Sequence, residues 1–311
     1  MKIIVKNSSE IYNIIPQIQE ALNNTVYENL ELSIEFKKNF VYPEVLTSLV
    51  AFINWCNNTY NNFIINNIDY DISNLYLHRM KFFKLIPYNE KEPVYQKHDS
   101  MGKFIEITPL NFDKNNKVTI QSNIVDNIIK IFRDNYKLKE ELYRCLNYCI
   151  WELIDNIQNH SGECGTGYIS AQNFPNKKEI RICIVDTGMG IYNSLTSSPN
   201  SLYQDITEEE AMIKCVEANV TNGSGMGNGL YHTTQFIKAN GGDLYLYSGN
   251  YCLEVSSGCN PVIRKSDKWN GTLVFLRIDT ENTVDYDDVF DNCMIPASVD
   301  ECDDELDGLW S

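Results

Sequence analysis

Four short segments hold the residue types and spacings from which chemistry could be built. They are ELIDNIQNH (152–160), DTGMGI (186–191), GSGMGNGL (223–230) and NGT (270–272). Glycines let backbone N–H groups approach a phosphate closely, and the start of a following helix adds its positive dipole end. The third segment therefore favours contact with a phosphate, although a glycine-rich loop is often only a turn.

The first segment lies on a helix predicted for residues 138–161. Its apolar positions recur at about 100° per residue and form one stripe: Leu142, Leu146, Cys149, Ile150, Leu153 and Ile157. Glu152, Asn156 and Asn159 lie within about 60° of one another beside this stripe. Polar groups in that position border the core and can line a pocket, and a solvated helix edge is the alternative.

The other segments are predicted at the ends of strands and at a helix start. EIRICIVD (179–186) is a β-rich run that leads Asp186 into a turn containing Gly188 and Gly190, and it can aim that carboxylate into a cleft. Glycines at 223, 225, 227 and 229 precede a helical pattern, and 269–278 is a predicted strand. Each piece alone is a weak signal, but four pieces in this order and spacing are much harder to obtain by chance.

Together the four segments resemble the N box, the two glycine boxes and the final Gly-Thr of the GHKL ATPases. This superfamily includes the ATPase chain of DNA gyrase, the heat-shock chaperone ATPases, MutL and histidine kinases. The resemblance covers about residues 110–280. It implies an α/β (α+β) Bergerat fold, in which helices lie on a mixed β-sheet, with ATP and Mg²⁺ bound between the N-box helix and a mobile lid at about 192–224.

The resemblance also implies roles for single residues. The Asn156 side-chain oxygen would bind Mg²⁺, for which an amide oxygen is a suitable hard ligand. Asp186 would accept a hydrogen bond from the adenine amino group, with Thr272 supporting it. The remaining expected nucleotide-binding residues are Asn159, His160, Gly188, Gly190, Ile191, Gly225, Gly227, Gly229 and Leu230. His160 could instead cap the end of its helix.

Glu152 lies one helical turn before Asn156, where hydrolysing relatives and anti-sigma-factor kinases place a general base. A carboxylate there could orient water for attack on the γ-phosphate. The resemblance implies a Mg²⁺-dependent ATPase that hydrolyses ATP to ADP and phosphate and controls a partner protein. The alternatives are a protein serine/threonine kinase of the anti-sigma-factor type and an ATP-sensing module without turnover. A phosphorelay through His78 or His98 is disfavoured. The phosphoaccepting His of histidine kinases is usually followed by an acidic residue on a helix, whereas His78 is followed by Arg79, and His98 lies in a polar linker without helical periodicity.

The first hundred residues form a separate predicted unit. Helical spacing at 11–22, a strand at 30–36, a helix at 43–57, a strand at 63–68 and a helix at 72–86 alternate. This unit resembles a STAS-type domain, but its VYPEVLTSL segment (41–49) has no hydroxyl residue at the helix start. It is therefore expected to bind a partner protein. We expect domains at 1–102 (STAS-like) and 103–280 (ATPase), followed by an acidic tail at 281–311.

Charge and composition narrow the function classes. The 311 residues carry a net charge of −16, which excludes nonspecific nucleic-acid binding by bulk charge. Residues 281–311 hold eleven acidic and no basic side chains, so the preceding residues carry only −5. The tail is either a disordered, solubilising end or a segment that docks on a basic partner or on the body.

The remaining signals concern the setting of the protein. There is no apolar stretch of about 18 residues and no secretory signal, which favours a cytoplasmic protein away from membranes. The ten cysteines form no CxxC pair and are expected to be reduced thiols. Zinc binding by His160 and Cys164 would need further ligands that are not found nearby. Beyond ATP, the expected partners are a regulatory or effector protein and a second copy of the chain.

Overall fold

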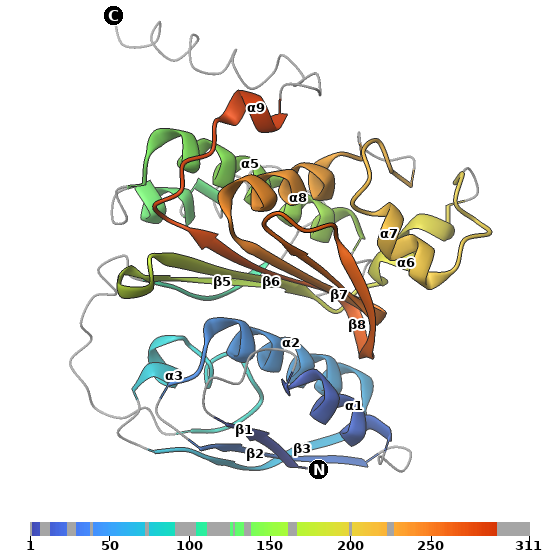
Figure 1. Cartoon of the computed structure of the whole chain (residues 1–311). Coiled ribbons are helices and arrows are strands. Elements are labelled where there is room, and N and C mark those ends of the chain that lie inside the picture. Colours follow the sequence, from blue (N-terminus) through green and yellow to red (C-terminus); the bar gives the residue numbers. More distant parts are fainter. Residues whose placement is uncertain are drawn as a thin grey trace, which may run out of the picture.

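The computed structural model describes residues 2–6, 13–23, 29–37, 40–71, 75–90, 104–110, 125–126, 128–133, 138–160, 167–198, 201–222 and 227–290. Figure 1 shows that these residues stack in four layers. A three-stranded sheet is covered by α1 and α2, and these helices lie under a five-stranded sheet whose other face carries α5 and α8. The expected sandwich of helices on a sheet is confirmed for the second unit.

The N-terminal unit is a parallel sheet with the order β1-β2-β3. Its elements are β1 (Lys2–Val5), α1 (Ile15–Asn23), β2 (Asn29–Phe36), α2 (Pro43–Thr59), β3 (Asn62–Asp69) and α3 (Tyr76–Arg79). Leu30, Leu32, Ile34 and Phe36 alternate along β2 and are all buried, as a strand with one covered face requires. The strand β1 was not predicted from the sequence.

The helix predicted for 72–86 is wrong over most of its length. Helix α3 ends at Arg79, and Lys81 has a φ of 61°, which breaks helical geometry. Met80, Phe82 and Phe83 are all buried, yet on a helix they would point in different directions around the axis. The turn at Lys81 lets all three enter the core, so burial outweighs the local helical pattern.

The second unit contains an antiparallel sheet with the order β4-β5-β6-β8-β7. Its strands are β4 (Phe104–Leu110), β5 (Gly167–Phe174), β6 (Glu179–Asp186), β7 (Asp243–Ser256) and β8 (Val262–Asp279). Its helices are α5 (Glu140–His160), α6 (Gly190–Thr196), α7 (Glu208–Lys214), α8 (Gly229–Asn240) and α9 (Tyr286–Phe290), with a 3₁₀ turn at Pro175–Lys177. The sheet was expected to be mixed, but all its described strand pairs are antiparallel.

One face of this sheet packs against α5 and α8. The predicted apolar stripe of α5 is confirmed, because all six of its residues are buried in one hydrophobic cluster. Cys145 and Cys149 also belong to this cluster and pack in the core. All cysteines in the described part of the chain are free thiols.

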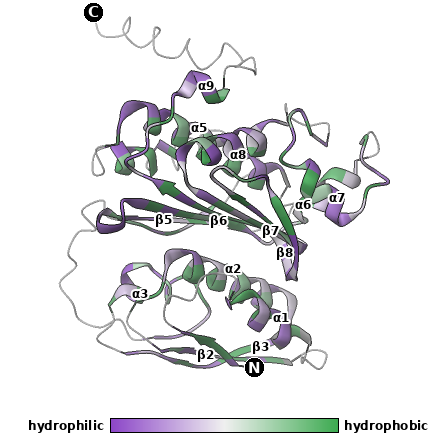
Figure 2. Cartoon of the chain, viewed as in Figure 1, coloured by the Kyte–Doolittle hydropathy of each residue, from purple (hydrophilic) through white to green (hydrophobic). Residues whose placement is uncertain are grey.

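The opposite face of the sheet packs against the N-terminal unit. Helix α2 is buried along most of its length, and one hydrophobic cluster joins it to residues of β5, β6, β7 and β8. Figure 2 shows hydrophobic residues in α2 and in the strands above it. The domain boundary near residue 102 stays a prediction, but the two units share a core.

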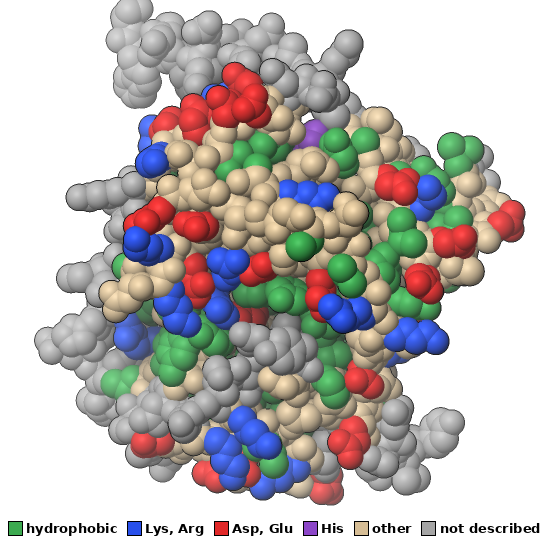
Figure 3. All heavy atoms as spheres, in the orientation of Figure 1, with side chains coloured by type: hydrophobic (Ala, Val, Ile, Leu, Met, Phe, Trp, Pro, Cys, Tyr) green, Lys and Arg blue, Asp and Glu red, His purple; other side chains and the backbone are tan. Residues whose placement is uncertain are grey.

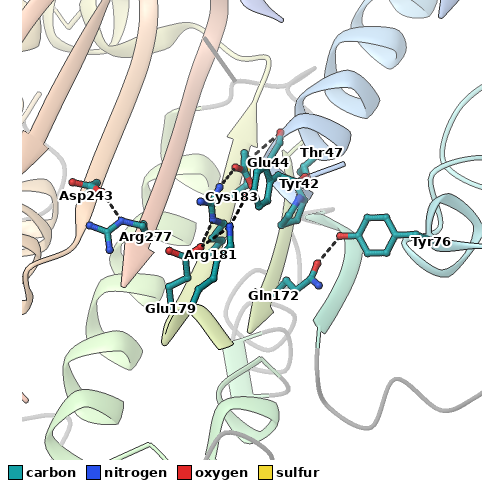
Figure 4. A network of polar contacts seen from close by, with 12 residues as sticks. Tyr42, Glu44, Thr47, Tyr76, Gln172, Glu179, Arg181, Cys183, Asp243 and Arg277 are labelled. Atoms are coloured by element: carbon teal, nitrogen blue, oxygen red, sulfur yellow. Dashed lines mark hydrogen bonds and ion pairs between the residues drawn. The ribbon is translucent and has the colours of Figure 1, made fainter. Parts of the chain in front are cut away.

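Polar contacts add to this interface (Figure 4). Arg181 of β6 binds Glu44 of α2 through Nη1 and Oε1 at 2.8 Å and Glu179 through Nε and Oε1 at 2.9 Å. The guanidinium carbon of Arg181 lies 3.8 Å from the centre of the Tyr42 ring. The hydroxyls of Thr47 and Ser170 are 2.6 Å apart. The start of α2, where STAS domains usually present their phosphorylated residue, is therefore covered by the second unit.

The first part of the predicted acidic tail packs on the body. Val284 and Phe290 are buried, and α9 contacts α5 and α8. The side-chain amide of Asn240 donates hydrogen bonds to the backbone oxygens of Asp279 and Asn282, at 2.9 and 3.0 Å. Residues 281–290 thus dock on the body, whereas 291–311 lie outside the described residues.

Two further observations concern the charge of the surface and the apolar content of the described helices. Acidic and basic side chains are interspersed over the face drawn in Figure 3, in line with the modest charge of the body. None of the described helices has the length and apolar content needed to cross a membrane.

Candidate functional site

Glu152 and Asn156 lie one turn apart on α5 and are both half-buried. Burial raises the pKa of the Glu152 carboxyl above its ordinary value, and a hydrogen bond with Tyr148 opposes part of this rise. A carboxylate with a raised pKa beside an amide oxygen is suited to exchange a proton with a reacting group.

The start of α8 lies directly against Glu152. A Cβ atom placed on Gly229, the first residue of α8, would come within 2.5 Å of Glu152 Oε2 and within 2.9 Å of Glu152 Cβ. Only a glycine allows this approach. The N-terminal residues of α8 and the carboxylate of Glu152 therefore share one small space.

The first turn of α8 receives no capping hydrogen bond from its N-cap residue. Asn228 stands at the N-cap position without a capping hydrogen bond, because its Oδ1 accepts a hydrogen bond of 2.7 Å from the backbone N–H of Asn219 instead. Gly227 has a φ of 72°, and a Cβ there would lie 2.4 Å from the oxygen of Val220. Uncapped N–H groups and the positive end of the helix dipole make this helix start suitable for a phosphate.

Asp186 ends β6 and is 4% exposed. Burial raises its pKa to about 7, against hydrogen bonds from Gly188 and Thr272. The backbone N–H of Gly188 donates to Asp186 Oδ1 at 2.7 Å. Asp186 and Thr272 are therefore brought together as predicted, and the carboxylate is held in a fixed orientation.

The glycine turn after Asp186 is fixed by a residue that the sequence analysis missed. Ser248 Oγ accepts a hydrogen bond from the backbone N–H of Ile191 and donates one to the oxygen of Gly271, both at 2.9 Å. Gly190 has a φ of 74°, and a Cβ there would lie 2.8 Å from Ser248 Oγ. Ser248 was missed because one buried serine in an apolar strand has no local motif.

A second missed residue is Trp269, which was part of a predicted strand but had no assigned role. Its Nε1 donates a hydrogen bond of 3.3 Å to the backbone oxygen of Asp186. Gly271 follows two residues later with a φ of 95°, and a Cβ there would lie 2.3 Å from the same oxygen. The NGT segment therefore needs its glycine in order to pass closely beside Asp186.

A tight contact between α5 and β5 places the end of α5 near the strand end that carries Asp186. A Cβ on Gly167 would lie 2.9 Å from Ile157 Cγ2. Gly167 is also the register partner of Asp186 in the neighbouring strand. Ile157 follows Asn156 on α5, so this packing brings the end of α5 over the end of β6 that carries Asp186.

Some predicted site residues are not brought into this cluster. Asn159 is exposed, and its Nδ2 donates a hydrogen bond of 2.7 Å to Asp155 Oδ2. His160 is the last residue of α5, and its side chain lies outside the described residues, as does all of Gly225. Leu230 is half-buried in the first turn of α8 and packs against the core.

The segment predicted as a lid contains α6 and α7. Glu208 at the start of α7 accepts hydrogen bonds from the backbone and side-chain nitrogens of Asn250 in β7, both at 2.9 Å. A cavity of about 280 Å³ lies beside this contact, and Gly188, Gly190 and Gly271 are part of its lining. Part of the segment is therefore attached to the strands that carry the glycine turn.

Comparison with known proteins agrees with this geometry. Residues 142–282 match the family model described as "Histidine kinase-, DNA gyrase B-, and HSP90-like ATPase". The matched range begins in α5 and ends after β8, so it includes every residue of the cluster described above. No curated protein matched the chain.

Proposed function

Because residues 142–282 belong to the histidine kinase-, DNA gyrase B- and HSP90-like ATPase family, we propose that this protein hydrolyses ATP to ADP and phosphate with Mg²⁺. The observation that carries the proposal is the position of Glu152, which is half-buried against the first residue of α8 and one turn before Asn156.

The residues fit a nucleotide at both ends. Asp186 would accept a hydrogen bond from the adenine amino group, because its carboxylate is held at the end of β6 by Gly188 and Thr272. The uncapped N–H groups at the start of α8 would donate to the phosphates. Gly227 and Gly229 leave room there that a Cβ would fill.

Glu152 would act as the general base. Its carboxylate would orient a water molecule and accept a proton from it as the water oxygen attacks the γ-phosphorus. The raised pKa of Glu152 suits this role, since a stronger base accepts a proton more readily once it is ionised. Asn156 would supply an amide oxygen for Mg²⁺, which neutralises phosphate charge when bound.

The segment from α6 to Val220 would close on the nucleotide. The contacts between Glu208 and Asn250 and between Asn219 and Asn228 attach it to β7 and to the start of α8. The start of α8 is the part of the site that would bind phosphate. Closing of this segment would then control a partner protein. The N-terminal unit is the proposed contact region for that partner, and a second copy of the chain is a further candidate partner.

Phosphate release by the purified full chain tests the proposal. The variants are Glu152→Gln, Asn156→Ala and, as a matched control on an exposed carboxylate of the same helix, Glu140→Gln. Glu152→Gln should lower turnover by about 10²–10⁴-fold while ATP binding is retained, and Asn156→Ala should weaken Mg²⁺-dependent binding. Equal turnover in all four proteins would disprove a role of Glu152 in hydrolysis.

The same assay separates hydrolysis from phosphotransfer. Labelled ATP is incubated with the protein and with candidate partners, and label is then measured on protein and as free phosphate. Label on a partner would replace the hydrolysis proposal by a kinase. Calorimetric binding of ATP without any release of phosphate would replace it by an ATP-sensing module.

A further inference from the structure

A polar chain links the candidate base to α8. Tyr148 lies one turn before Glu152 on α5, so the two side chains lie on the same side of the helix, and an interaction with the Tyr148 hydroxyl lowers the pKa of Glu152. The same hydroxyl lies 2.8 Å from Nδ1 of His232, which is on the second turn of α8. Tyr148 therefore stands between a carboxylate on one helix and an imidazole on the other.

The direction of these hydrogen bonds follows from the chemistry of the three groups. An ionised carboxylate can only accept a hydrogen bond, so the Tyr148 hydroxyl is the donor toward Glu152. The phenol oxygen is then free to accept from His232, which requires the proton of the neutral imidazole to be on Nδ1. His232 is 3% exposed, and burial lowers its pKa, which favours the neutral ring.

Aromatic packing holds the two rings in place. The Phe290 ring lies 4.7 Å from the Tyr148 ring and 5.2 Å from the His232 ring, measured between centroids. Tyr231 packs against His232 at 5.5 Å, and Tyr286 packs against Phe290 at 4.5 Å. Phe290 is 2% exposed, so α9 covers one side of this cluster.

We infer that Tyr148, supported by His232, is the positioning residue for Glu152. It holds the carboxylate ionised and turned toward the start of α8. This inference rests on the proposed role of Glu152 as a base. Tyr148 itself touches no reacting atom, so its effect passes through Glu152.

Other charged or titratable groups near Tyr148 and Glu152 must be considered. Asp155 on α5 raises the pKa of Glu152, and Cys149 on α5 and Tyr286 on α9 act on the pKa of Tyr148. His232 is the titratable group that α8 contributes. None of these groups is removed by Tyr148→Phe, so this variant isolates the hydroxyl.

The first measurement is the titration of Glu152 by NMR on the full chain with ¹³C-labelled glutamate. Glu152 is assigned from the signal lost in Glu152→Gln. In Tyr148→Phe the pKa of Glu152 should rise, because the hydrogen bond that lowers it is gone. The control Tyr143→Phe removes a hydroxyl from the same helix and should leave the titration unchanged. An unchanged Glu152 titration in Tyr148→Phe would overturn the inference, whether or not the protein hydrolyses ATP.

The second measurement is the pH dependence of phosphate release. Tyr148→Phe should lower turnover at pH 7 by about two- to tenfold and move the acid limb to higher pH. A merely structural role would lower turnover at every pH without moving that limb, which would also overturn the inference. Absence of turnover in the wild-type protein would instead disprove the proposed function, and the titration would still decide whether Tyr148 controls Glu152.

Two variants of His232 complete the test. His232→Asn keeps a donor near the position of Nδ1, so it should retain most of the turnover. His232→Phe keeps the ring packing but removes the donor, so its acid limb should move in the same direction as that of Tyr148→Phe. Identical behaviour of the two variants would show that His232 only fills space.

Discussion

The ion cluster between the two units allows a quantitative prediction. The Arg181 side chain is 9% exposed, and its partners Glu44 and Glu179 are 1% and 10% exposed. Replacing it by methionine, which is similar in length, removes the cation that pairs with Glu44 and leaves Glu179 with the more distant Lys177, at 3.9 Å. Breaking a buried pair in this way costs about 3–5 kcal/mol. The free energy of unfolding of Arg181→Met should fall by that amount.

Glu44→Gln should be milder. Arg181 would keep its hydrogen bond to Glu179 and its contact with the Tyr42 ring, so the expected loss is about 1–3 kcal/mol. The double variant Glu44→Leu with Arg181→Met should lose less than the sum of the single variants Glu44→Leu and Arg181→Met, because each single change leaves one charged member of the pair buried, whereas the double change removes both charges. A coupling energy of about 1–3 kcal/mol is expected.

Urea unfolding followed by circular dichroism, with calorimetry as a second probe, measures these effects. For a chain of 311 residues, a loss of 3–5 kcal/mol corresponds to a decrease in melting temperature of roughly 5–8 °C. The control is Arg264→Met, since the pair of Arg264 with Glu254 is exposed and should contribute about 0–1 kcal/mol. If Arg181→Met is no less stable than this control, the cluster does not hold the two units together.

Two further predictions concern the site and the tail. ATP affinity should decrease by about tenfold between pH 8 and pH 6, because protonation of Asp186, whose pKa is about 7, removes its acceptor oxygen. The raised pKa stabilises the folded state at low pH relative to neutral pH, so unfolding through this group cannot cause the decrease. A pH dependence that is unchanged in Asp186→Asn would refute the assignment. A chain that ends at Phe290 should be as stable as the full chain. A chain that ends at Asn282 lacks the buried Val284 and Phe290 side chains, so its free energy of unfolding in urea should be lower by about 3–6 kcal/mol. Equal stability of the two truncated chains would show that α9 does not dock.

Local patterns predicted α5, β6, α8 and the second part of β8, but not β5 or β7. The stripe on α5, the run that leads to Asp186 and the start of α8 appear where the sequence places them. These features depend on periods of 3.6 and 2 residues and on the conformational freedom of glycine, which act within a few residues. The same patterns failed for 72–86, where burial of Met80, Phe82 and Phe83 outweighed the helical spacing.

Such patterns predicted only part of the candidate site. Glu152, Asp186 and Thr272 carry motif signals, but Ser248 and Trp269 support the site through single hydrogen bonds that leave no mark in the neighbouring sequence. Tyr148 illustrates the same limit. Its helix and its spacing from Glu152 could be read directly, whereas its contact with His232 joins residues 84 positions apart.

The sequence by itself determined the chemical content of this protein: a carboxylate and an amide one turn apart, an aspartate at a strand end, and glycines before a helix. Tertiary structure alone decided what surrounds them. It placed α2 against the sheet through Arg181 and Glu44, and it docked Phe290 of the acidic segment on Tyr148 and His232. The physical reason is that burial and ion pairing act between surfaces that meet only after folding, so their partners need no regular spacing along the chain.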